Sequence, residues 1–373
     1  MIFGSLFITA LYVFLMLLLK RGQNKLAPFI LGSSKSITQF SVIVPFRDEA
    51  HNLEALLNSF QNLDYPKDLF EIILVNDFSS DNFLEIITKY KDLLPNLSRI
   101  DAIESNMSPK KAALSLGISK AKYDWIITTD ADCIVPKTWL KAFHQKITND
   151  KPLLVVGLVS FNPVSSFLDK FQALDLLSLQ ATLLGTFGLK KPMLCHGANL
   201  CYAKSLFYEL NGFESHQNIA SGDDVFLLEE AVKKHPDKVV VINSLDAVVA
   251  TKPEPTFKAL LSQRMRWAAK ATSYNNLHIK IVGFIVFAMN LVLVSTAVLS
   301  LFGLFSAKFF LLLFLVKFNI DAFILFSIAK FFKQESVLKS YVFSSILYPF
   351  FSVASVILGF TSSYQWKKRT FKK

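Results

Sequence analysis

Residues 124–132 read Asp-Trp-Ile-Ile-Thr-Thr-Asp-Ala-Asp, an apolar run that ends in two acidic residues. The stretch 124–129 predicts a buried strand, which places Asp130 and Asp132 where the strand gives way to a loop. Two carboxylates at this spacing can face a divalent cation beside a diphosphate, because Mg²⁺ combines few protein carboxylates with phosphate oxygens. Taken alone, the same pair also fits a solvated acidic turn.

The chain around this stretch alternates short apolar runs with amphipathic segments. Strands are predicted at residues 41–45 and 70–75, and helices at residues 52–60, 83–94 and 111–120. This alternation is typical of an α/β fold with a mostly parallel sheet, whose ligands bind at the carboxyl ends of the strands. Asn76-Asp77 and Asp130-Ala-Asp132 both follow predicted strands at that edge. We expect residues 40–270 to form one compact catalytic domain.

Further motifs occur in order along this region. They read Ser41-Val-Ile-Val-Pro-Phe-Arg47-Asp-Glu49, Leu74-Val-Asn-Asp77-Phe-Ser-Ser-Asp81, Lys110-Lys-Ala-Ala-Leu114, Asp130-Ala-Asp132, His196-Gly-Ala-Asn199, Gly222-Asp-Asp224 and Gln263-Arg-Met-Arg266-Trp267. The set resembles membrane-bound family 2 glycosyltransferases, the branch that includes cellulose, chitin and hyaluronan synthases and ceramide glucosyltransferase. The first four motifs resemble the nucleotide-sugar half of that family and the last three its acceptor half. The Gln-x-x-Arg-Trp pattern is the most specific.

The resemblance implies a GT-A fold, which is a Rossmann-like α/β domain, here with N-terminal and C-terminal transmembrane helices. It also implies a nucleotide-sugar donor, for which we expect a UDP-linked hexose, and transfer with inversion. The donor-binding residues that it implies are Pro45, Arg47, Glu49, Asp77, Lys110 and Asp130. Asp130 and Asp132 would hold Mg²⁺ or Mn²⁺, and Asp224 would be the general base. The residues that it implies for the diphosphate and the acceptor are Asn199, Asp223, Gln263, Arg266 and Trp267.

These roles agree with the chemistry of the residue types. A base must lie within hydrogen-bond reach of the acceptor hydroxyl, and Asp223 can raise the proton affinity of the neighbouring Asp224 carboxylate by like-charge repulsion. Arg266 suits bidentate contact with phosphate, and Trp267 offers a flat face to a sugar ring. Each residue also has a structural alternative. Asp224 can stabilise a helix N-terminus, and Arg266 with Trp267 can anchor the chain at a membrane interface.

Three positions depart from the family's pattern. Asn76 stands where many relatives have an acid, and Phe78 replaces a common glycine, so we expect a differently shaped base-binding loop. Phe226 stands where the synthases often carry another acid. The identities of the donor base and of the acceptor class therefore stay open.

Hydrophobic residues make up 52% of the 373 residues, and the excess lies in long segments. Residues 2–19 are uncharged and would span about 27 Å as a helix, enough to cross a bilayer core. Lys20 and Arg21 follow at once, so we expect an anchor, residues 1–20, whose C-terminal end lies in the cytosol. Further candidate spans are residues 281–305, 309–329 and 341–360, within a C-terminal membrane region 279–363.

The last of these segments conflicts with the charge of the tail that follows it. If all three segments cross, the basic tail 364–373 ends outside the cell, against the positive-inside rule. A bent or re-entrant helix at Pro349 would keep this tail cytosolic. Lys317 and Asp321 in the second segment can neutralise each other on one helix face, or can contact an acceptor or a lipid.

The net charge of +11 favours anionic lipid at a cytoplasmic face over nucleic acid as a partner. Three cysteines indicate a reducing compartment, and Cys195, His196 and Cys201 match no common zinc pattern. We therefore expect a multi-pass protein of the cell membrane with a cytosolic catalytic domain that transfers a hexose to a lipid or glycan acceptor. The alternatives are a processive polysaccharide synthase and a non-catalytic scaffold that binds sugar nucleotides.

Overall fold

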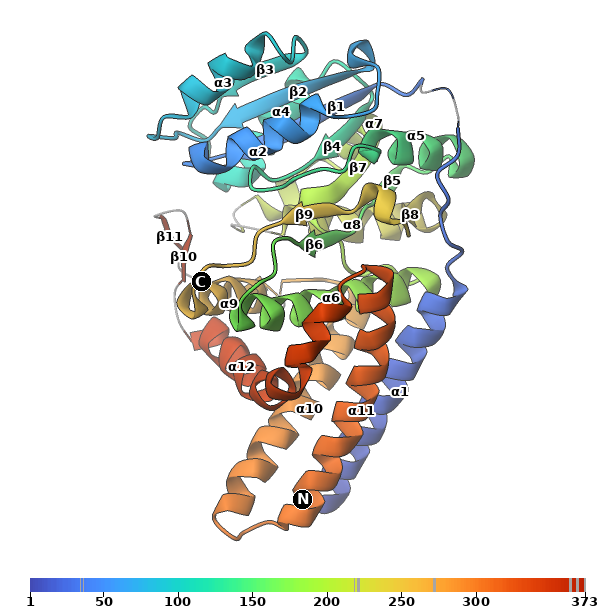
Figure 1. Cartoon of the computed structure of the whole chain (residues 1–373), viewed down its shortest axis with the longest axis vertical. Helices are drawn as coiled ribbons and strands as arrows, with labels where there is room; N and C mark the ends of the chain where they lie inside the picture. The colour runs from blue at the N-terminus through green and yellow to red at the C-terminus, as the bar shows by residue number, and fades with distance from the viewer. Residues whose placement is uncertain are drawn as a thin grey trace. The chain divides into compact units, whose positions relative to one another are not determined.

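The computed structural model describes residues 1–33, 35, 37–217, 219, 222–270, 273–361, 364–366 and 369–371. Four cations of the basic tail, Lys367, Lys368, Lys372 and Lys373, lie outside the described residues. The chain forms two compact units, whose elements are labelled in Figure 1. Unit 1 comprises Met1–Leu26, Pro163–Lys191 and Pro253–Lys373, and unit 2 comprises Ala27–Asn162 and Pro192–Lys252. Residues 163–191 and 253–270 of the predicted catalytic domain belong to unit 1 and its other residues to unit 2, and the bounds 40–270 stay a prediction.

Unit 2 is an α/β unit around a seven-stranded sheet with the order β3-β2-β1-β4-β7-β5-β8. Its strands are β1 (Phe40–Phe46), β2 (Phe70–Asn76), β3 (Leu97–Asp101), β4 (Trp125–Thr128), β5 (Leu154–Val156), β7 (Leu200–Ala203) and β8 (Val239–Val241), with a separate pair β6 (Val159–Phe161) and β9 (Val249–Thr251). Its α-helices are α2 (Ala50–Gln61), α3 (Phe83–Lys91), α4 (Pro109–Lys120), α5 (Trp139–Asp150), α7 (Lys204–Glu209) and α8 (Asp223–Lys234). Strand β7 runs antiparallel to β4 and β5, so the sheet is mixed.

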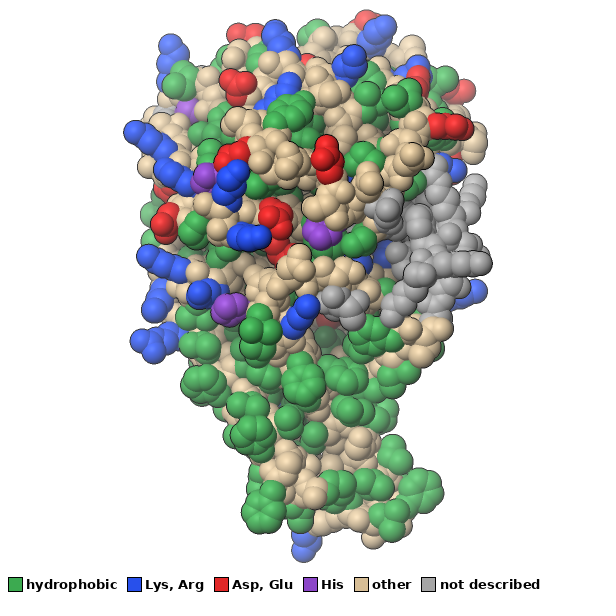
Figure 2. Space-filling model, turned by 180° about the vertical axis from the view of Figure 1, so that it is seen from behind, with side chains coloured by type: hydrophobic (Ala, Val, Ile, Leu, Met, Phe, Trp, Pro, Cys, Tyr) green, Lys and Arg blue, Asp and Glu red, His purple; other side chains and the backbone are tan. Residues whose placement is uncertain are grey.

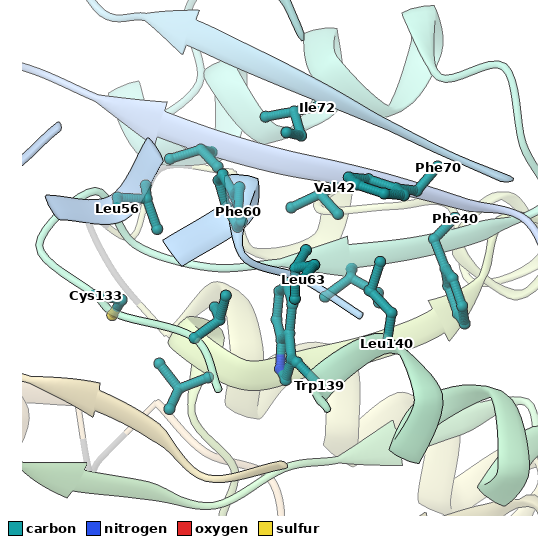
Figure 3. Close-up of a cluster of buried hydrophobic side chains, with 14 of the residues drawn as sticks. Phe40, Val42, Leu56, Phe60, Leu63, Phe70, Ile72, Cys133, Trp139 and Leu140 are labelled. Atoms are coloured by element: carbon teal, nitrogen blue, oxygen red, sulfur yellow. The ribbon is translucent and has the colours of Figure 1, made fainter. Parts of the chain in front are cut away.

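Strand β1 is buried on both faces, which explains its nearly continuous apolar sequence. Phe40, Val42 and Val44 belong to a core that also takes in α2 and α5, part of which Figure 3 shows. Ile43, on the opposite face, contacts α4, where a Cβ added at Gly117 would lie 2.5 Å from Ile43 Cγ2. The helices thus fix β1 from both sides and hold the loop that follows it.

Unit 1 consists mainly of long helices. They are α1 (Ile2–Lys25), α6 (Phe167–Gly188), α9 (Phe257–Lys270), α10 (Leu277–Leu301), α11 (Ala307–Phe331) and α12 (Tyr341–Thr361), with the 3₁₀ turn η6 (Glu335–Ser340) and the strands β10 (Tyr364–Trp366) and β11 (Arg369–Phe371). Four of them are long and apolar enough to cross a membrane: α1, α10, α11 and the combined η6 and α12. Hydrophobic side chains cover the long helices on the face shown in Figure 2.

Helices α1 and α6 approach each other so closely that only glycine fits at the contact. A Cβ at Gly22 would lie 2.0 Å from the Gly185 carbonyl oxygen, and one at Gly188 would lie 1.8 Å from the Gly22 oxygen. Gln23 Nε2 also donates to the Ala181 carbonyl at 2.9 Å. This backbone contact explains why α6, although it interrupts the α/β sequence, belongs to unit 1.

Helix α12 contains Pro349 and bends along its length in Figure 1. At its start, the Tyr341 hydroxyl donates to the Phe318 carbonyl of α11 at 2.6 Å. Near its end, Gly359 lies against α9, where an added Cβ would be 2.9 Å from the Met265 carbonyl oxygen. The end of α12 therefore packs on α9.

Two opposite charges inside the helical bundle pair with each other. Lys317 forms an ion pair with Asp321 one turn along α11. The Tyr12 hydroxyl of α1 donates to the other Asp321 oxygen at 2.6 Å. Of the two roles that the sequence left open for Lys317 and Asp321, these contacts support mutual neutralisation and helix packing.

Candidate active site

The loops that carry the predicted donor residues meet at one edge of the sheet in unit 2. Strand β1 pairs in parallel with β2 and β4, so Arg47, Asp77 and Asp130 all follow the carboxyl ends of adjacent strands. Arg47 Nη1 lies 3.9 Å from Asp77 Oδ2 and donates to the Asp77 carbonyl oxygen at 3.2 Å. Pro45, half-buried in β1, lies beside Val75 of β2 in the register.

Two of the three positions that depart from the family's pattern shape the loop after β2. Asn76 Nδ2 donates to Asp101 Oδ1 at 2.9 Å, while its Oδ1 accepts from the Ser79 N–H at 2.9 Å. Phe78 has a φ of 54°, in the left-handed region that favours glycine. The loop therefore keeps a backbone suited to glycine, and its Phe78 side chain is 49% exposed.

Carboxylates crowd the loop after β4. Burial, together with the charges of Asp130 and Glu49, raises the pKa of Asp132 to about 6. Asp132 Oδ2 also accepts a hydrogen bond from Thr251 Oγ1 at 3.2 Å. A site where carboxylates repel one another binds a divalent cation well, because the cation removes the repulsion. The residues present therefore fit the metal that the sequence predicts.

Lys110 balances part of this negative charge. Its Nζ lies 2.7 Å from Asp130 Oδ1 and 3.8 Å from Asp223 Oδ2. Burial lowers the pKa of Lys110, but Asp130 and Asp223 outweigh burial and hold the pKa well above its ordinary value. Lys110 therefore stays charged and joins the loop after β4 to the start of α8.

The predicted base, Asp224, lies at the first turn of α8 with both carboxylate oxygens on backbone amides. Oδ2 accepts from the Gly197 N–H at 2.8 Å and Oδ1 from the Val225 N–H at 2.8 Å. Asp224 thus also stabilises a helix N-terminus, the structural alternative that the sequence left open. A carboxylate oxygen has a second lone pair, so these bonds leave capacity to accept a proton.

Glycine at position 197 keeps the acidic residues close together. A Cβ there would lie 3.2 Å from Asp223 Oδ2, 3.5 Å from Lys110 Nζ and 3.6 Å from Asp224 Cβ. Next to it, burial lowers the pKa of His196 to about 4, although Asp130 acts in the opposite direction. His196 is therefore a neutral group beside the acids at neutral pH, a position that its motif alone did not reveal.

Asn199 is held by structural hydrogen bonds. Its Oδ1 accepts from Trp139 Nε1 at 2.9 Å, and its Nδ2 donates to the carbonyl oxygens of Leu158 and Ala247, both at 2.7 Å. The side chain is fully buried. These bonds use both amide hydrogens, so contact with a diphosphate would require breaking one of them, and the contacts support a positioning role.

A zinc site at Cys195, His196 and Cys201 gains no support. The described part of the chain has no group of three or more His, Cys, Asp or Glu side chains placed to hold a metal ion. Both cysteines are buried as free thiols. Two carboxylates with phosphate oxygens from a substrate, the arrangement expected for Asp130 and Asp132, need no such group.

The Gln-x-x-Arg-Trp motif lies on α9 in unit 1. Gln263 Nε2 donates to Glu254 Oε1 at 2.7 Å, and its Oε1 accepts from Arg264 Nη1. Arg266 and Trp267 are half-buried, and the Arg264 guanidinium lies over the Trp267 ring, 4.1 Å from its centroid. The motif is therefore ordered by contacts within unit 1.

An ion pair that sequence reasoning missed holds α9 in place. Arg264 Nε donates to Asp175 Oδ2 of α6 at 2.7 Å, and both side chains are buried. The Tyr348 hydroxyl of α12 donates to Asp175 Oδ1 at 2.9 Å. The sequence feature that could have indicated this pair is Asp175, an acidic residue in the middle of an apolar helix.

Comparisons with known proteins agree with this geometry. Residues 41–209 match Glycosyl transferase family 2, a segment that ends before Asp223, Asp224 and the motif on α9. Poly(ribitol-phosphate) beta-N-acetylglucosaminyltransferase TarS of Staphylococcus aureus is 29% identical over 156 residues, which is 41% of this chain and 27% of TarS. Poly-beta-1,6-N-acetyl-D-glucosamine synthase of the same organism is 36% identical over 136 residues, which is 35% of this chain and 31% of the synthase.

Among solved structures, the mannosyltransferase PcManGT from Pyrobaculum calidifontis, in complex with GDP-Man and Mn2+, is similar over 96% of both chains. The TM-score is 0.61 at 18% sequence identity, a likeness in fold alone. It confirms the predicted GT-A fold with apolar helices at both ends. By contrast, the chain spans less than a third of the length of the two staphylococcal relatives.

Proposed function

We propose that the chain, whose residues 41–209 match Glycosyl transferase family 2, transfers a hexose from a nucleotide sugar to a lipid or glycan acceptor at the cytosolic face of the membrane. The observation that supports this proposal most directly is the acidic cluster at the sheet edge. Burial and the charges of Asp130 and Glu49 raise the pKa of Asp132 there, and Lys110 forms an ion pair with Asp130. Such a cluster suits a divalent cation and a nucleoside diphosphate.

In this proposal Asp130 and Asp132 hold Mg²⁺ or Mn²⁺ against the diphosphate. The metal, when bound, stabilises the negative charge that grows on the departing diphosphate. Lys110 keeps Asp130 oriented, while Arg47 and Asp77 line the neighbouring loops for the nucleotide. A UDP-linked donor is our choice, and the names of both staphylococcal relatives make N-acetylglucosamine the first sugar to test.

Asp224 is the proposed general base. The acceptor hydroxyl oxygen attacks the anomeric carbon, the bond from that carbon to the diphosphate oxygen breaks, and the hydroxyl proton passes to Asp224. Its bonds to the Gly197 and Val225 amides hold the carboxylate in one orientation. This direct displacement inverts the anomeric configuration. Arg266 and Trp267 are proposed to contact the diphosphate and the acceptor sugar.

We further propose that α1, α10 and α11 cross the membrane and that α12 enters and returns on the cytosolic side. The contact of Gly359 with α9, together with Pro349 in the same helix, supports the re-entrant path. This topology keeps the basic residues that follow α12 in the cytosol, as the positive-inside rule favours. A lipid or a short glycan on a lipid then suits the acceptor.

The similarity to a polysaccharide synthase favours one alternative, repeated transfer to a growing chain. Three membrane-crossing helices are few to enclose an export channel, and the internal charges of Lys317 and Asp321 pair with each other. We therefore rank single transfer first. The length of the product separates the two: one added sugar supports single transfer, and a ladder of products supports polymerisation.

The experiment is a panel of labelled nucleotide sugars given to purified full-length protein with membrane lipids, with and without Mn²⁺. We expect metal-dependent transfer from one donor. The Asp224→Asn variant should lose about 10²- to 10⁴-fold in rate while it still binds that donor. The exposed acid on the turn after α8 provides a matched control, Asp237→Asn, which should keep its activity. If no donor is consumed, or if Asp224→Asn is fully active, the proposal is wrong. A non-catalytic scaffold that binds sugar nucleotides then becomes the better interpretation.

A further inference from the structure

A groove runs along helices α1 and α11 of unit 1, apart from the residues proposed for transfer. One part has a volume of about 590 Å³ and is lined by residues that include Lys20, Phe323, Phe326 and Tyr341. A second part of about 420 Å³ is lined by Val13, Leu315, Val316, Asn319 and Ile320. Asn319 lines both parts, so they adjoin. The lining is mostly apolar, and Phe323 and Phe326 are 52% and 60% exposed.

One cation stands in this groove without a carboxylate. Lys20 Nζ donates to Ser327 Oγ of α11 and to Gln23 Oε1 at 3.4 Å. No described carboxylate forms an ion pair with Lys20, whereas Lys317 on the same pair of helices is paired with Asp321. A half-buried ammonium with only neutral partners lacks the anion that would offset its desolvation.

The side chain of Lys20 takes a different direction from those of the neighbouring cations. A basic residue at the end of an apolar helix often extends toward water, and Arg21 and Lys25 are indeed exposed. Lys20 instead turns toward α11, where its Nζ lies 6.0 Å from the centre of the Phe323 ring. Its charge therefore faces the groove, next to hydroxyl and amide groups that can also bind a phosphate oxygen.

We propose that this groove binds an anionic phospholipid, with the lipid phosphate at Lys20 and an acyl chain along the apolar surface between α1 and α11. The chemistry of the groove favours this occupant, because a cation without a carboxylate partner lines one part of it and mostly apolar side chains line the rest. The combined volume suits a headgroup and the upper part of a chain. This lipid is distinct from the acceptor and needs no nucleotide sugar to bind.

The test measures how much phosphatidylglycerol the full-length protein retains in detergent micelles, by native mass spectrometry, without nucleotide or metal. Wild type should retain one molecule saturably, and phosphatidylcholine should not replace it. Lys20→Gln should weaken retention about fivefold, the usual effect of one cation near a lipid surface. Arg21→Gln removes the adjacent exposed cation and should change retention less than twofold.

A second variant separates the groove from its charge and guards against misfolding of the first. Ala322 lines the groove, and Ala322→Phe should fill it and abolish saturable retention while Lys20 remains. Both variants must keep the wild-type thermal midpoint and helix content to count. Equal losses in Lys20→Gln and Arg21→Gln would overturn the proposal, as would unchanged retention in Ala322→Phe. Displacement of the lipid by millimolar inorganic phosphate would also overturn it, since the site would then bind a free anion.

Discussion

Charged side chains are buried in both units, but they are arranged in opposite ways. In unit 1, Asp175 forms an ion pair with Arg264, and Asp321 forms one with Lys317. A tyrosine hydroxyl donates a hydrogen bond to each of the two carboxylates. At the sheet edge of unit 2, Asp130 and Asp223 share Lys110, and burial together with the charges of Asp130 and Glu49 raises the pKa of Asp132. Ion pairs are typical of residues that stabilise a fold, whereas like charges held close together are typical of a ligand-binding site.

The largest expected effect tests the repulsion between carboxylates at the sheet edge. Asp132→Asn should lower the transfer rate about 10³-fold, because a metal ligand contributes several kcal/mol to stabilising the departing diphosphate. The thermal midpoint should stay level or rise, since the change removes a buried charge that Asp130 and Glu49 repel. Asp64→Asn, at an exposed ion pair with Lys141, is the control and should change neither quantity. A large drop in thermal midpoint for Asp132→Asn would mean that the acids are structural.

The next effect tests the paired charges of unit 1. Arg264→Met should lower stability by about 3–5 kcal/mol, because it leaves the Asp175 carboxylate buried without its cation. The measurement is the free energy of unfolding in detergent. The double variant with Asp175→Leu should recover most of that loss, since it removes both charges.

Its control is an exposed pair. Arg99→Met breaks the surface contact with Asp101 and should cost less than about 1 kcal/mol. If Arg264→Met costs no more than Arg99→Met, the pair with Asp175 does not fix α9, and the contrast between the units fails. If the double variant stays as unstable as the single one, packing around Arg264 matters more than its charge.

A smaller effect tests whether backbone packing, besides charge, holds unit 1 together. Gly185→Ala should cost about 1–3 kcal/mol, because its Cβ would lie 2.7 Å from the Leu19 carbonyl oxygen and force α1 away from α6. Gly283→Ala, in a helix where nothing lies within 4 Å of the added Cβ, should be neutral or stabilise the protein by up to about 1 kcal/mol. Equal effects of the two changes on the thermal midpoint would show that the close approach of α1 and α6 contributes nothing.

Local features of this molecule could be predicted from its sequence. The strands at residues 41–45 and 70–75 were predicted within one residue of β1 and β2, because β-branched runs buried on both faces leave a clear pattern. The acidic edge followed from the parallel order of these strands. Helix α3 ends at Lys91, three residues before the predicted end, because Leu94 turns into the core outside the helix.

Long-range contacts could not be predicted in this way. Nothing local indicates that β7 inserts antiparallel between β4 and β5, or that glycines attach α6 to α1. Asn199 looked like a ligand because of its motif, but its partner Trp139 lies 60 residues away along the chain. The set of site residues therefore stays a prediction from the sequence, and the structure adds the hydrogen bonds that hold residues such as Asn199 in the fold.

The smallest effect is a pH dependence that follows from Asp132. Its pKa of about 6 in the folded protein lies above the usual value of about 4, so the folded chain holds this proton more tightly than the unfolded chain. Without metal, the contribution of Asp132 to stability is therefore greatest below about pH 4 and is lost as the pH rises to about 6. Thermal midpoints measured in chelator between pH 4.5 and 7 should show this decline relative to Asp132→Asn, which cannot titrate. Mn²⁺ needs the deprotonated carboxylate, so its stabilising effect should grow over the same interval. Parallel curves for the two proteins would mean that the carboxylates at the sheet edge do not repel one another, and the contrast with unit 1 would then lose its physical basis.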